Sequence, residues 1–589
     1  MDSIYRWGSF GKGGDQLMLD YGRVALANIA QLNKSMVLPE LYGASPIASP
    51  TANRIAIQKS LDMGGYVRLE SKGIIEIDEP LIISSDTYFA LGGGVTLYLK
   101  DGVSKNVIKN RASTLTGVRD TNIVIEGGTF VRGSGSSTGG SVDTHAILIR
   151  NVDNVLVRQL SVGVKTGKYA VNLGNVTNFT ASHLTFLDTS SDGVHINGPA
   201  RDGRIHHIRG VTHDDTVAIT ANDYEAYADT VGDVSNIHIY DIEATGKAAN
   251  IVKVLAGEGC AVDDIFVDNV RGSHAQHGVW IGDDNGYPST DNGTHGSITV
   301  RDVITEGKNA TSCTVYGNLA NGAEKITLEN VGIKGLSTNA VKIGLETSGV
   351  INELRVDDIN SSGMSGRKAV RIEGTGTVNR LILNNPTMKV VGGNGGLLDI
   401  PSTHLGKIHI TNPDLEADDT TSTNWFNIGE QASLQSSTIS GGRIKGGRCV
   451  FHENADGEFT ITGGTVISGV NRVANSYLKQ STYKLGEVTV TDALNPLFMV
   501  NSTAPGINII GGDGTVTPNN PPLVARSGTQ TMRVKGVNLK ADINGLTGSL
   551  GDIVTTSVAQ GSIPAGHPVI SDGAGVWKSL ISGSTWTKA

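Results

Sequence analysis

The sequence predicts an all-β chain that coils into a right-handed parallel β-helix, and three observations support this fold class. Glycine is abundant and proline scarce, with 77 Gly against 16 Pro in 589 residues, while aromatic residues make up 5%. Short β-branched runs alternate with Gly, Asn, Asp and Ser, a pattern of many strands joined by tight turns. An apolar-variable-apolar triplet also recurs, as at Val194 and Val217, with the period expected of stacked repeats.

Charge, hydropathy and cysteine content exclude several classes of partner. The formal net charge is −9, and nucleic acid is bound by an excess of Lys and Arg, so we expect no nucleic-acid partner. The sequence contains no run of about 18 apolar residues, so we predict no membrane span. The start, residues 1–8, shows no secretory signal because it has neither a basic nor an apolar segment. Cys260, Cys313 and Cys449 lack disulfide or metal-ligand spacing, and we predict no metal or cofactor.

Taken in order, the chain divides into four predicted regions. They are an N-terminal attachment or linker region at 1–45, a capping helix with the first β turns at 46–110, the parallel β-helix at 111–480 and a C-terminal β-rich oligomerisation module at 481–589. Ser49-Pro50-Thr51 is typical of a helix start, and Gly64-Gly65 of its end. A solenoid needs such a cap because its first turn would otherwise expose the apolar core. Beyond about residue 480 the repeat period becomes hard to follow.

The repeat itself is clearest between residues 147 and 372. The triplets begin at Ile147, Val171, Val194, Val217, Val252, Val279, Cys313, Val341 and Val370. A second strand signal precedes several triplets, which favours a coil of stacked strands over propeller blades. Strand alternation places the outer members of each triplet in the core and the middle member in solvent. The predicted outward column is Asn172, His195, Ala218, Lys253, Trp280, Thr314, Lys342 and Arg371.

Three carboxylates fall on two adjacent turns of this predicted coil. Asp192 lies two positions before one triplet, and Asp215, with Asp214 beside it, lies two positions before the next. Stacked strands are about 4.8 Å apart, so these side chains share one surface. Asp-Gly and Asp-Asp are also ordinary turn dipeptides. Stacked like charges cost stability, so we expect three aspartates to lie together only where a function compensates for this cost. We therefore interpret them as candidate catalytic residues.

Further residues of the predicted surface are candidates for substrate binding. The first four are His195, Lys253, His277 and Trp280. An exposed Trp beside polar groups suits stacking against a sugar ring. The ordinary alternatives are that His195 is a solvated strand residue and Lys253 a simple surface lysine. An insertion after the triplet at 217–219 supplies three more candidates for the wall of a groove, Tyr224, Glu225 and Tyr227.

Asp192-Gly193 followed by Asp214-Asp215 is similar to the aspartate triad of polygalacturonase-type glycoside hydrolases, inverting enzymes on pectate-lyase-like right-handed β-helices. That resemblance implies Asp214 as the acid and Asp192 with Asp215 as the pair that activates water. The sequence departs from the family on the following turn, which offers Asn250 and Lys253, so pectin is not implied as the substrate.

The chain also resembles phage tailspike depolymerases, in its capping helix, its coil and its residue pattern over 551–578. This second resemblance implies a protein of the virion tail that acts outside the cell, a homotrimer, and attachment to a tail or baseplate protein through the N-terminal region.

Three hypotheses about function follow. The leading one is a tailspike that hydrolyses a bacterial capsule, exopolysaccharide or O-antigen as an endo-acting, inverting glycoside hydrolase. The second is a polysaccharide lyase in which Lys253 or His195 removes a proton α to a uronate carboxylate. The third is a non-catalytic adhesin spike that binds glycan without cleaving it.

Overall fold

The computed structural model describes residues 36–135, 144–223, 230–282, 293–335, 339–345, 349–363, 366–453, 457–476 and 481–491, and then the strands between 498 and 587. It consists of two compact units, Met1–Thr245 and Gly246–Ala589. Most of the predicted attachment region, residues 1–35, lies outside the described residues. None of the helices described is long and apolar enough to cross a membrane.

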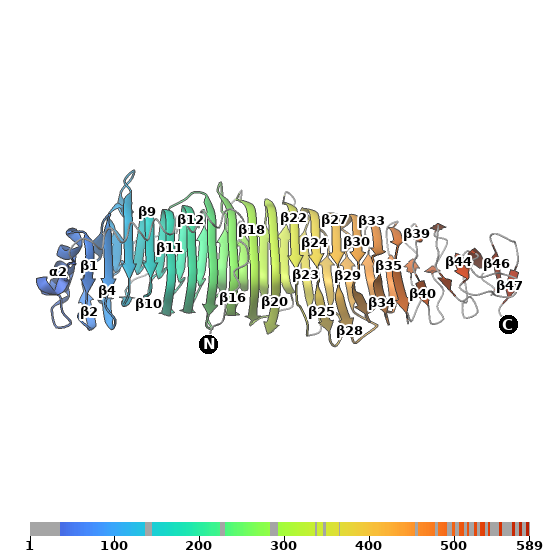
Figure 1. Cartoon of the computed structure of the whole chain (residues 1–589), viewed down its shortest axis with the longest axis horizontal. Coiled ribbons are helices and arrows are strands. Elements are labelled where there is room, and N and C mark those ends of the chain that lie inside the picture. The colour runs from blue at the N-terminus through green and yellow to red at the C-terminus, as the bar shows by residue number, and fades with distance from the viewer. Residues whose placement is uncertain are drawn as a thin grey trace, which may run out of the picture. The chain divides into compact units, whose positions relative to one another are not determined.

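A helical cap precedes the first strands of the first unit (Figure 1). The helices are η1 (Pro39–Tyr42), α2 (Pro50–Asp62) and, further along, η2 (Arg111–Thr114). The Asn53 amide of α2 donates a hydrogen bond to the Glu76 carbonyl at 3.1 Å. The Gln58 amide donates to the Ile82 carbonyl at 2.9 Å and accepts from the Ile82 N–H at 2.8 Å. The helix thus pairs with the backbone at the open end of the coil, as a cap must.

The first unit is a coil with three strand-bearing faces. One face holds β1 (Gly65–Leu69), β4 (Thr87–Leu91), β7 (Asp120–Glu126) and β14 (Val234–Ala244). A second holds β2 (Gly73–Ile77), β5 (Val95–Leu99), β8 (Thr129–Arg132) and β10 (Ser161–Val164), and a third holds β3 (Leu81–Ile83), β6 (Ile108–Asn110) and β13 (Val217–Thr220). The long strand β9 (Ile147–Arg158) continues from the third face onto the first, and β11 (Val171–Thr189) and β12 (Val194–Thr212) continue further onto the second.

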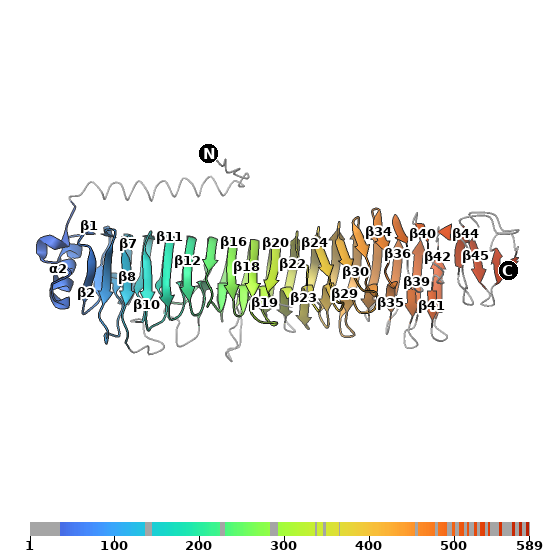
Figure 2. The same cartoon turned by 90° about the horizontal axis from the view of Figure 1, so that it is seen from below.

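The strand pairings described in the first unit are all parallel. Figure 2 shows its strands following one another in chain order along the coil. Parallel strands joined in sequence make right-handed crossovers. The predicted right-handed parallel β-helix is therefore confirmed.

Aliphatic side chains fill the interior of the coil in stacks. Two of them are Val171–Val194–Val217 and Leu173–Ile196–Ile219, all fully buried and in register across β11, β12 and β13. Each side chain removed from water in this way contributes about 1.5–3 kcal/mol. The outer members of the triplets thus lie in the core, as predicted, and their positions fix where the turns carry their polar residues.

The second unit has the same parallel architecture. Its first face holds β15 (Asn250–Leu255), β17 (His277–Gly282), β19 (Cys313–Leu319), β21 (Asn339–Leu345), β23 (Lys368–Gly374), β26 (Gly396–Ile400), β29 (Asn424–Ile428), β32 (Cys449–Glu453), β35 (Arg472–Ser476), β38 (Phe498–Val500) and β41 (Val524–Arg526). Its second holds β16 (Ala261–His274), β18 (Thr294–Gly307), β20 (Gly322–Gly335), β22 (Val350–Asp357), β24 (Thr377–Asn384), β27 (His404–Thr411), β30 (Ser433–Ser440), β33 (Gly457–Thr462), β36 (Ser481–Leu485), β39 (Gly506–Gly511) and β42 (Thr531–Lys535). The third holds β25 (Thr387–Val390), β28 (Asp414–Ala417), β31 (Arg443–Lys445), β34 (Thr465–Ser468), β37 (Val488–Thr491) and β40 (Thr515–Thr517).

The C-terminal part of the second unit changes from parallel to antiparallel pairing. The last five strands are β43 (Lys540–Ala541), β44 (Ile553–Thr556), β45 (Pro568–Ser571), β46 (Val576–Ser579) and β47 (Thr585–Thr587). Parallel pairing runs on through β36, β39 and β42, whereas β44, β45, β46 and β47 pair antiparallel. Because β43 and β44 still pair parallel, antiparallel pairing begins with β44 and β45.

The strand register corrects one predicted triplet. Val279 pairs with Val315 and Trp280 with Tyr316, so the outward column contains Tyr316 where Thr314 was predicted. A slip of two residues keeps every side chain on the same face of a strand. Apolar alternation alone could not distinguish the two registers.

Candidate active site

Asp192, Asp214 and Asp215 lie together on the turns that lead into β12 and β13. One carboxylate oxygen of each lies within 4.8 Å of those of the other two. The pairing of Val194 with Val217 stacks the two turns directly. Asp192 and Asp215 are buried, and Asp214 is exposed. The trio therefore has two carboxylates held inside the turn and one that solvent or a ligand can reach.

Gly193 allows these two turns to approach. A Cβ at this position would lie 2.3 Å from the Phe186 ring and 2.5 Å from the Thr216 carbonyl oxygen, so no other residue fits without displacement. The Gly193 N–H also donates to the Asp215 carbonyl at 2.9 Å. The Asp192-Gly193 dipeptide is thus needed for close packing here as well as for the turn.

His195 contacts two carboxylates. Its Nδ1 lies 2.7 Å from Asp192 Oδ2, and its Nε2 lies 3.2 Å from Asp223 Oδ2. Burial on its own would lower the pKa of His195, but the hydrogen bonds to Asp192 and Asp223 outweigh burial and raise the pKa to about 9. At neutral pH His195 is therefore an imidazolium that donates to both carboxylates.

Two further donors contact Asp192. The Ser191 hydroxyl lies 3.2 Å from Asp192 Oδ1, and the Asp215 N–H points to the same oxygen at 3.4 Å. With His195 on the other oxygen, both oxygens of Asp192 accept hydrogen bonds. The carboxylate is held in one orientation, which suits an acceptor role in chemistry.

The expectation that His195 is solvated is wrong. Its exposure is 2%, and Asn172 and Ala218 in the same column are also buried. The Tyr169 ring stacks on the His195 ring with centroids 3.7 Å apart, and Asp223 contacts its Nε2. These side chains point away from the apolar core, as predicted, but neighbouring polar and aromatic side chains cover them.

Tyr169 and Asp223 are the site residues that the sequence did not single out. The Tyr169 hydroxyl donates to Asp223 Oδ2 at 3.0 Å, and the His145 ring stacks on the other side of Tyr169 with centroids 5.0 Å apart. One sign was available, because Tyr169 stands two positions before its triplet, as Asp192 and Asp215 do before theirs. Asp223, which follows β13, gave no such sign.

A buried hydrogen-bond network continues beneath His195. The Asn172 amide donates to Asn197 Oδ1 at 3.1 Å, and the Asn197 amide donates to the Thr220 hydroxyl at 3.0 Å. Thr220 Oγ1 also lies 3.0 Å from His195 Nε2. Buried polar groups that satisfy one another fix a single arrangement, so the histidine is positioned from below as well as from the side.

Lys253, His277 and Trp280 belong to the second unit. The Lys253 ammonium lies 5.2 Å from the Trp280 ring centroid, a cation–π contact, and the His277 ring stacks on Tyr316 with centroids 4.2 Å apart. Burial is the main cause that lowers the pKa of His277 to about 3, so this ring is neutral. Tyr316 joins this aromatic group because of the corrected register.

The predicted solvent exposure of this second group is wrong in degree. Lys253 is buried and Trp280 is half-buried, because the aromatic rings on neighbouring turns cover one another. The Trp280 indole N–H is buried and has no hydrogen-bond partner among the described residues. The loop candidates Tyr224, Glu225 and Tyr227 lie outside the described residues.

The trio of aspartates has two chemical uses. Carboxylates this close can transfer a proton to or from a bound substrate or water. Carboxylate oxygens are also the ligands that Ca²⁺ and Mg²⁺ prefer, so the same three side chains could hold a hard cation.

Comparison with known proteins adds the following. No family model matches the sequence, and no curated protein matches it either. Among solved structures, the catalytic unit of the GH87 α-1,3-glucanase of Streptomyces thermodiastaticus strain HF3-3 is 13% identical, with a TM-score of 0.36 over 85% of this chain and 70% of that one. The exopolygalacturonase of Thermotoga maritima is 12% identical, with a TM-score of 0.36 over 65% and 96%. Pre-mature gene product 12 of bacteriophage phi29 is 12% identical, with a TM-score of 0.38 over 97% and 77%. Likenesses of this size carry no argument about activity, which has to come from the site.

Proposed function

We propose that this chain is a glycoside hydrolase that depolymerises a polysaccharide. The observation that carries the proposal is the contact of three carboxylates, one exposed and two buried, on adjacent turns of a rigid coil. Glycoside hydrolysis needs a carboxylic acid that protonates the leaving oxygen and a carboxylate that serves as base or nucleophile. Three carboxylates this close together can supply both groups to one substrate.

The roles of the three aspartates follow from their environments. Asp214 is the exposed member, so it is the one able to reach a glycosidic oxygen, and we assign it as the acid. Asp192 is fixed by His195 and Ser191, and with Asp215 it would orient and activate water. His195 is a positioning residue, because it donates one hydrogen bond to Asp192 and the other to Asp223 and so holds Asp192 in place.

The state of His195 bears on the lyase alternative. A lyase base must begin with a free lone pair, whereas His195 is buried and protonated, and both of its nitrogens face carboxylates. His195 is therefore a poor base for β-elimination, and the lyase hypothesis rests on Lys253 alone. No described contact favours that hypothesis over hydrolysis.

The carboxylate spacing bears on the stereochemistry of cleavage. Inverting enzymes typically hold their two carboxyl groups about 6.5–9.5 Å apart and retaining enzymes about 5–5.5 Å apart. The sequence resemblance implies inversion, and so a separation of the acid and the base in the first range. Proton NMR of the first-formed anomer separates the two outcomes.

The biological setting that we propose rests on the sequence resemblance to phage tailspikes. In it, the substrate is a bacterial capsule, exopolysaccharide or O-antigen, and the protein is a homotrimer attached to a virion tail. Light scattering of the full-length protein tests the trimer. Removal of 481–589 should give monomers or aggregates, but that cut also removes β36, β39 and β42 of the coil. Removal of 540–589 alone tests the antiparallel strands more cleanly.

The test of the hydrolase proposal is incubation with a panel of purified bacterial surface glycans, followed by mass analysis of the products. We expect shorter fragments with new reducing ends from at least one glycan. Fragments that carry an unsaturated uronate would favour the lyase, and binding without fragments would favour the adhesin.

A further inference from the structure

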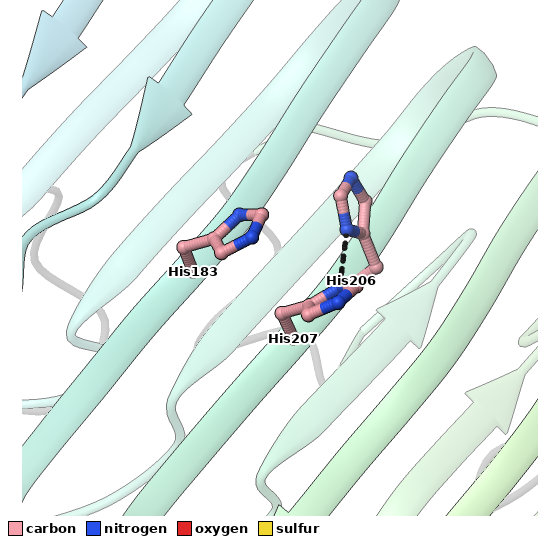
Figure 3. Close-up of side chains that lie close together, drawn as sticks. All are labelled: His183, His206 and His207. Atoms are coloured by element: carbon pink, nitrogen blue, oxygen red, sulfur yellow. Dashed lines mark hydrogen bonds between the residues drawn. The ribbon is translucent and has the colours of Figure 1, made fainter. Parts of the chain in front are cut away.

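A group of three histidines lies on the outer surface of the first unit. Figure 3 shows His183 on one strand and His206 and His207 on the neighbouring strand, with their rings close together. His183 belongs to β11, and the other two belong to β12. His183 and His207 are exposed, and His206 is half-buried. These residues lie in the second halves of their strands, whereas the candidate catalytic aspartates precede β12 and β13.

The parallel register brings the histidines together. Ser182 pairs with His206 and Leu184 with Ile208, so His183 stands opposite His207 on the next turn. Both have left-handed backbone conformations, with φ of 55° and 54°. On the following turn Asp241 occupies the same position, with φ of 57°.

Histidine is not the residue that this backbone position demands. Elsewhere in the first unit, left-handed positions carry asparagines whose amides form a ladder, Asn178 to Asn154 at 2.7 Å and Asn154 to Asn122 at 2.9 Å. Asn, Asp and His are the residues with a Cβ that adopt this conformation most often, and Asn and Asp are the shorter choices. His183 and His207 therefore place ring nitrogens on two successive turns, at positions where an Asn side chain would suit the left-handed backbone.

The ring nitrogens are close enough to share one ion. One nitrogen of each ring lies within 4.8 Å of those of the other two, and the Nδ1 atoms of His206 and His207 are 2.8 Å apart. Zinc–imidazole bonds are about 2.0–2.1 Å, so ligand nitrogens around a tetrahedral ion stand about 3.3 Å apart. Small rotations of the rings would reach that geometry from the present one.

Neighbouring side chains support these rings. The Tyr240 ring stacks on His206 with centroids 4.5 Å apart and planes 3° from parallel. Asp241 Oδ2 lies 3.5 Å from His207 Nδ1, close enough to serve as a further ligand. The cluster thus has three ligand nitrogens, an aromatic support and an adjacent acid.

We propose that His183, His206 and His207 bind a divalent transition-metal ion, with Zn²⁺ the first choice. Imidazole nitrogen is a preferred ligand of Zn²⁺, Ni²⁺ and Cu²⁺, whereas Ca²⁺ and Mg²⁺ prefer oxygen. An ion held here would join two successive turns of the coil and so stabilise the first unit. This proposal is independent of the hydrolase activity.

Isothermal titration calorimetry of ZnCl₂ into the untagged full-length protein tests the site. We expect saturable binding of one ion per chain and a rise in melting temperature when Zn²⁺ is present. His183→Asn and His207→Asn should each weaken binding at least about tenfold, since even second-shell changes cost that much. Both variants should fold, because Asn is accepted at these φ values.

Two controls keep the result specific. His404→Asn changes an exposed histidine of the second unit and should leave Zn²⁺ affinity unchanged. Asp214→Asn changes the carboxylate trio and should also leave it unchanged. The proposal fails if Zn²⁺ does not bind, if His183→Asn and His207→Asn bind it like the wild type, or if Asp214→Asn abolishes binding, which would place the ion among the aspartates.

Discussion

A group of turns in the second unit and the aspartate trio of the first unit arrange their charged side chains differently. In the second unit, positive side chains are paired with negative ones on the same or neighbouring turns. Arg371 lies 2.8 Å from Asp399, Asp399 accepts from the Asn427 amide at 2.7 Å, and Lys342 lies 2.7 Å from Glu373. Cross-strand pairs of opposite charge stabilise stacked strands.

In the first unit, by contrast, Asp192, Asp214 and Asp215 bring like charges within 4.8 Å of one another. The scaffold and the strand spacing are the same, so the coil does not require this arrangement. Carboxylates gathered at a cost to stability are typical of functional sites. The comparison teaches that pairing distinguishes a ladder that supports the fold from a cluster retained for chemistry.

The largest expected effect is on catalysis. Asp214→Asn and Asp215→Asn should each reduce turnover about 10²–10⁴-fold, because each removes a proton-transfer group. Initial rates of glycan cleavage measure this. Asp202→Asn is the matched control, since Asp202 is an exposed residue of β12 at a left-handed position where Asn also fits. Asp202→Asn should keep the wild-type rate. If Asp214→Asn and Asp215→Asn also keep most of the wild-type rate, these aspartates are not catalytic.

The next effect concerns pH and His195. The folded pKa of about 9 lies above the ordinary value of 6.5, so the stabilisation is complete below about pH 6.5 and is lost as pH rises through 9. A shift of this size corresponds to about 3 kcal/mol. Thermal melts between about pH 7 and pH 9.5 should show a loss of stability in the wild type that His195→Gln lacks. If the two proteins lose stability equally over this pH range, His195 is not the source of the pH dependence.

A smaller effect sharpens the contrast between the units. Asp399→Asn removes the charge that faces Arg371 and should lower the free energy of unfolding by about 1–3 kcal/mol. Asp215→Asn relieves like-charge repulsion and should leave the melting temperature equal or higher. Differential scanning calorimetry of the two variants measures both. If the melting temperature falls as much for Asp215→Asn as for Asp399→Asn, the aspartate trio stabilises the fold as the ion pairs do, and the contrast between them is wrong.

The smallest effect concerns Trp280. Trp280 lies half-buried beside Lys253 and Tyr316, so part of its ring is exposed and can stack against a sugar ring. Trp280→Ala should therefore weaken glycan binding more than it lowers the melting temperature. Trp425→Phe is the contrasting control, since Trp425 is fully buried and donates to the Gly446 carbonyl at 3.0 Å. That control should lower stability and leave binding unchanged. Unchanged binding with a large loss of stability in Trp280→Ala would make Trp280 a packing residue.

Much of the fold, and the meeting of the three aspartates, could be predicted because both depend on strand period. The triplets at Val194 and Val217 set the register, and the register fixes which turns stack. The cover over His195 could not be predicted in the same way. It comes from Tyr169 on another turn and from Asp223 beyond the end of a strand, and neither position follows from local alternation.

Two other features escaped prediction for different reasons. Tyr316 was missed because a register slip of two residues leaves the alternation of faces unchanged. His183 and His207 were missed because they occupy left-handed positions that look like ordinary polar turns in the sequence. Only the parallel pairing of β11 with β12 shows that they are neighbours.

The most direct test of the central claim is cleavage of a susceptible glycan in water enriched in ¹⁸O, followed by mass analysis of the new ends. Hydrolysis by the aspartate trio predicts that the wild type incorporates the heavy oxygen at each new reducing end and that Asp214→Asn yields almost no such product. Cleavage without incorporation of the label, or as much labelled product from Asp214→Asn as from the wild type, would contradict the account.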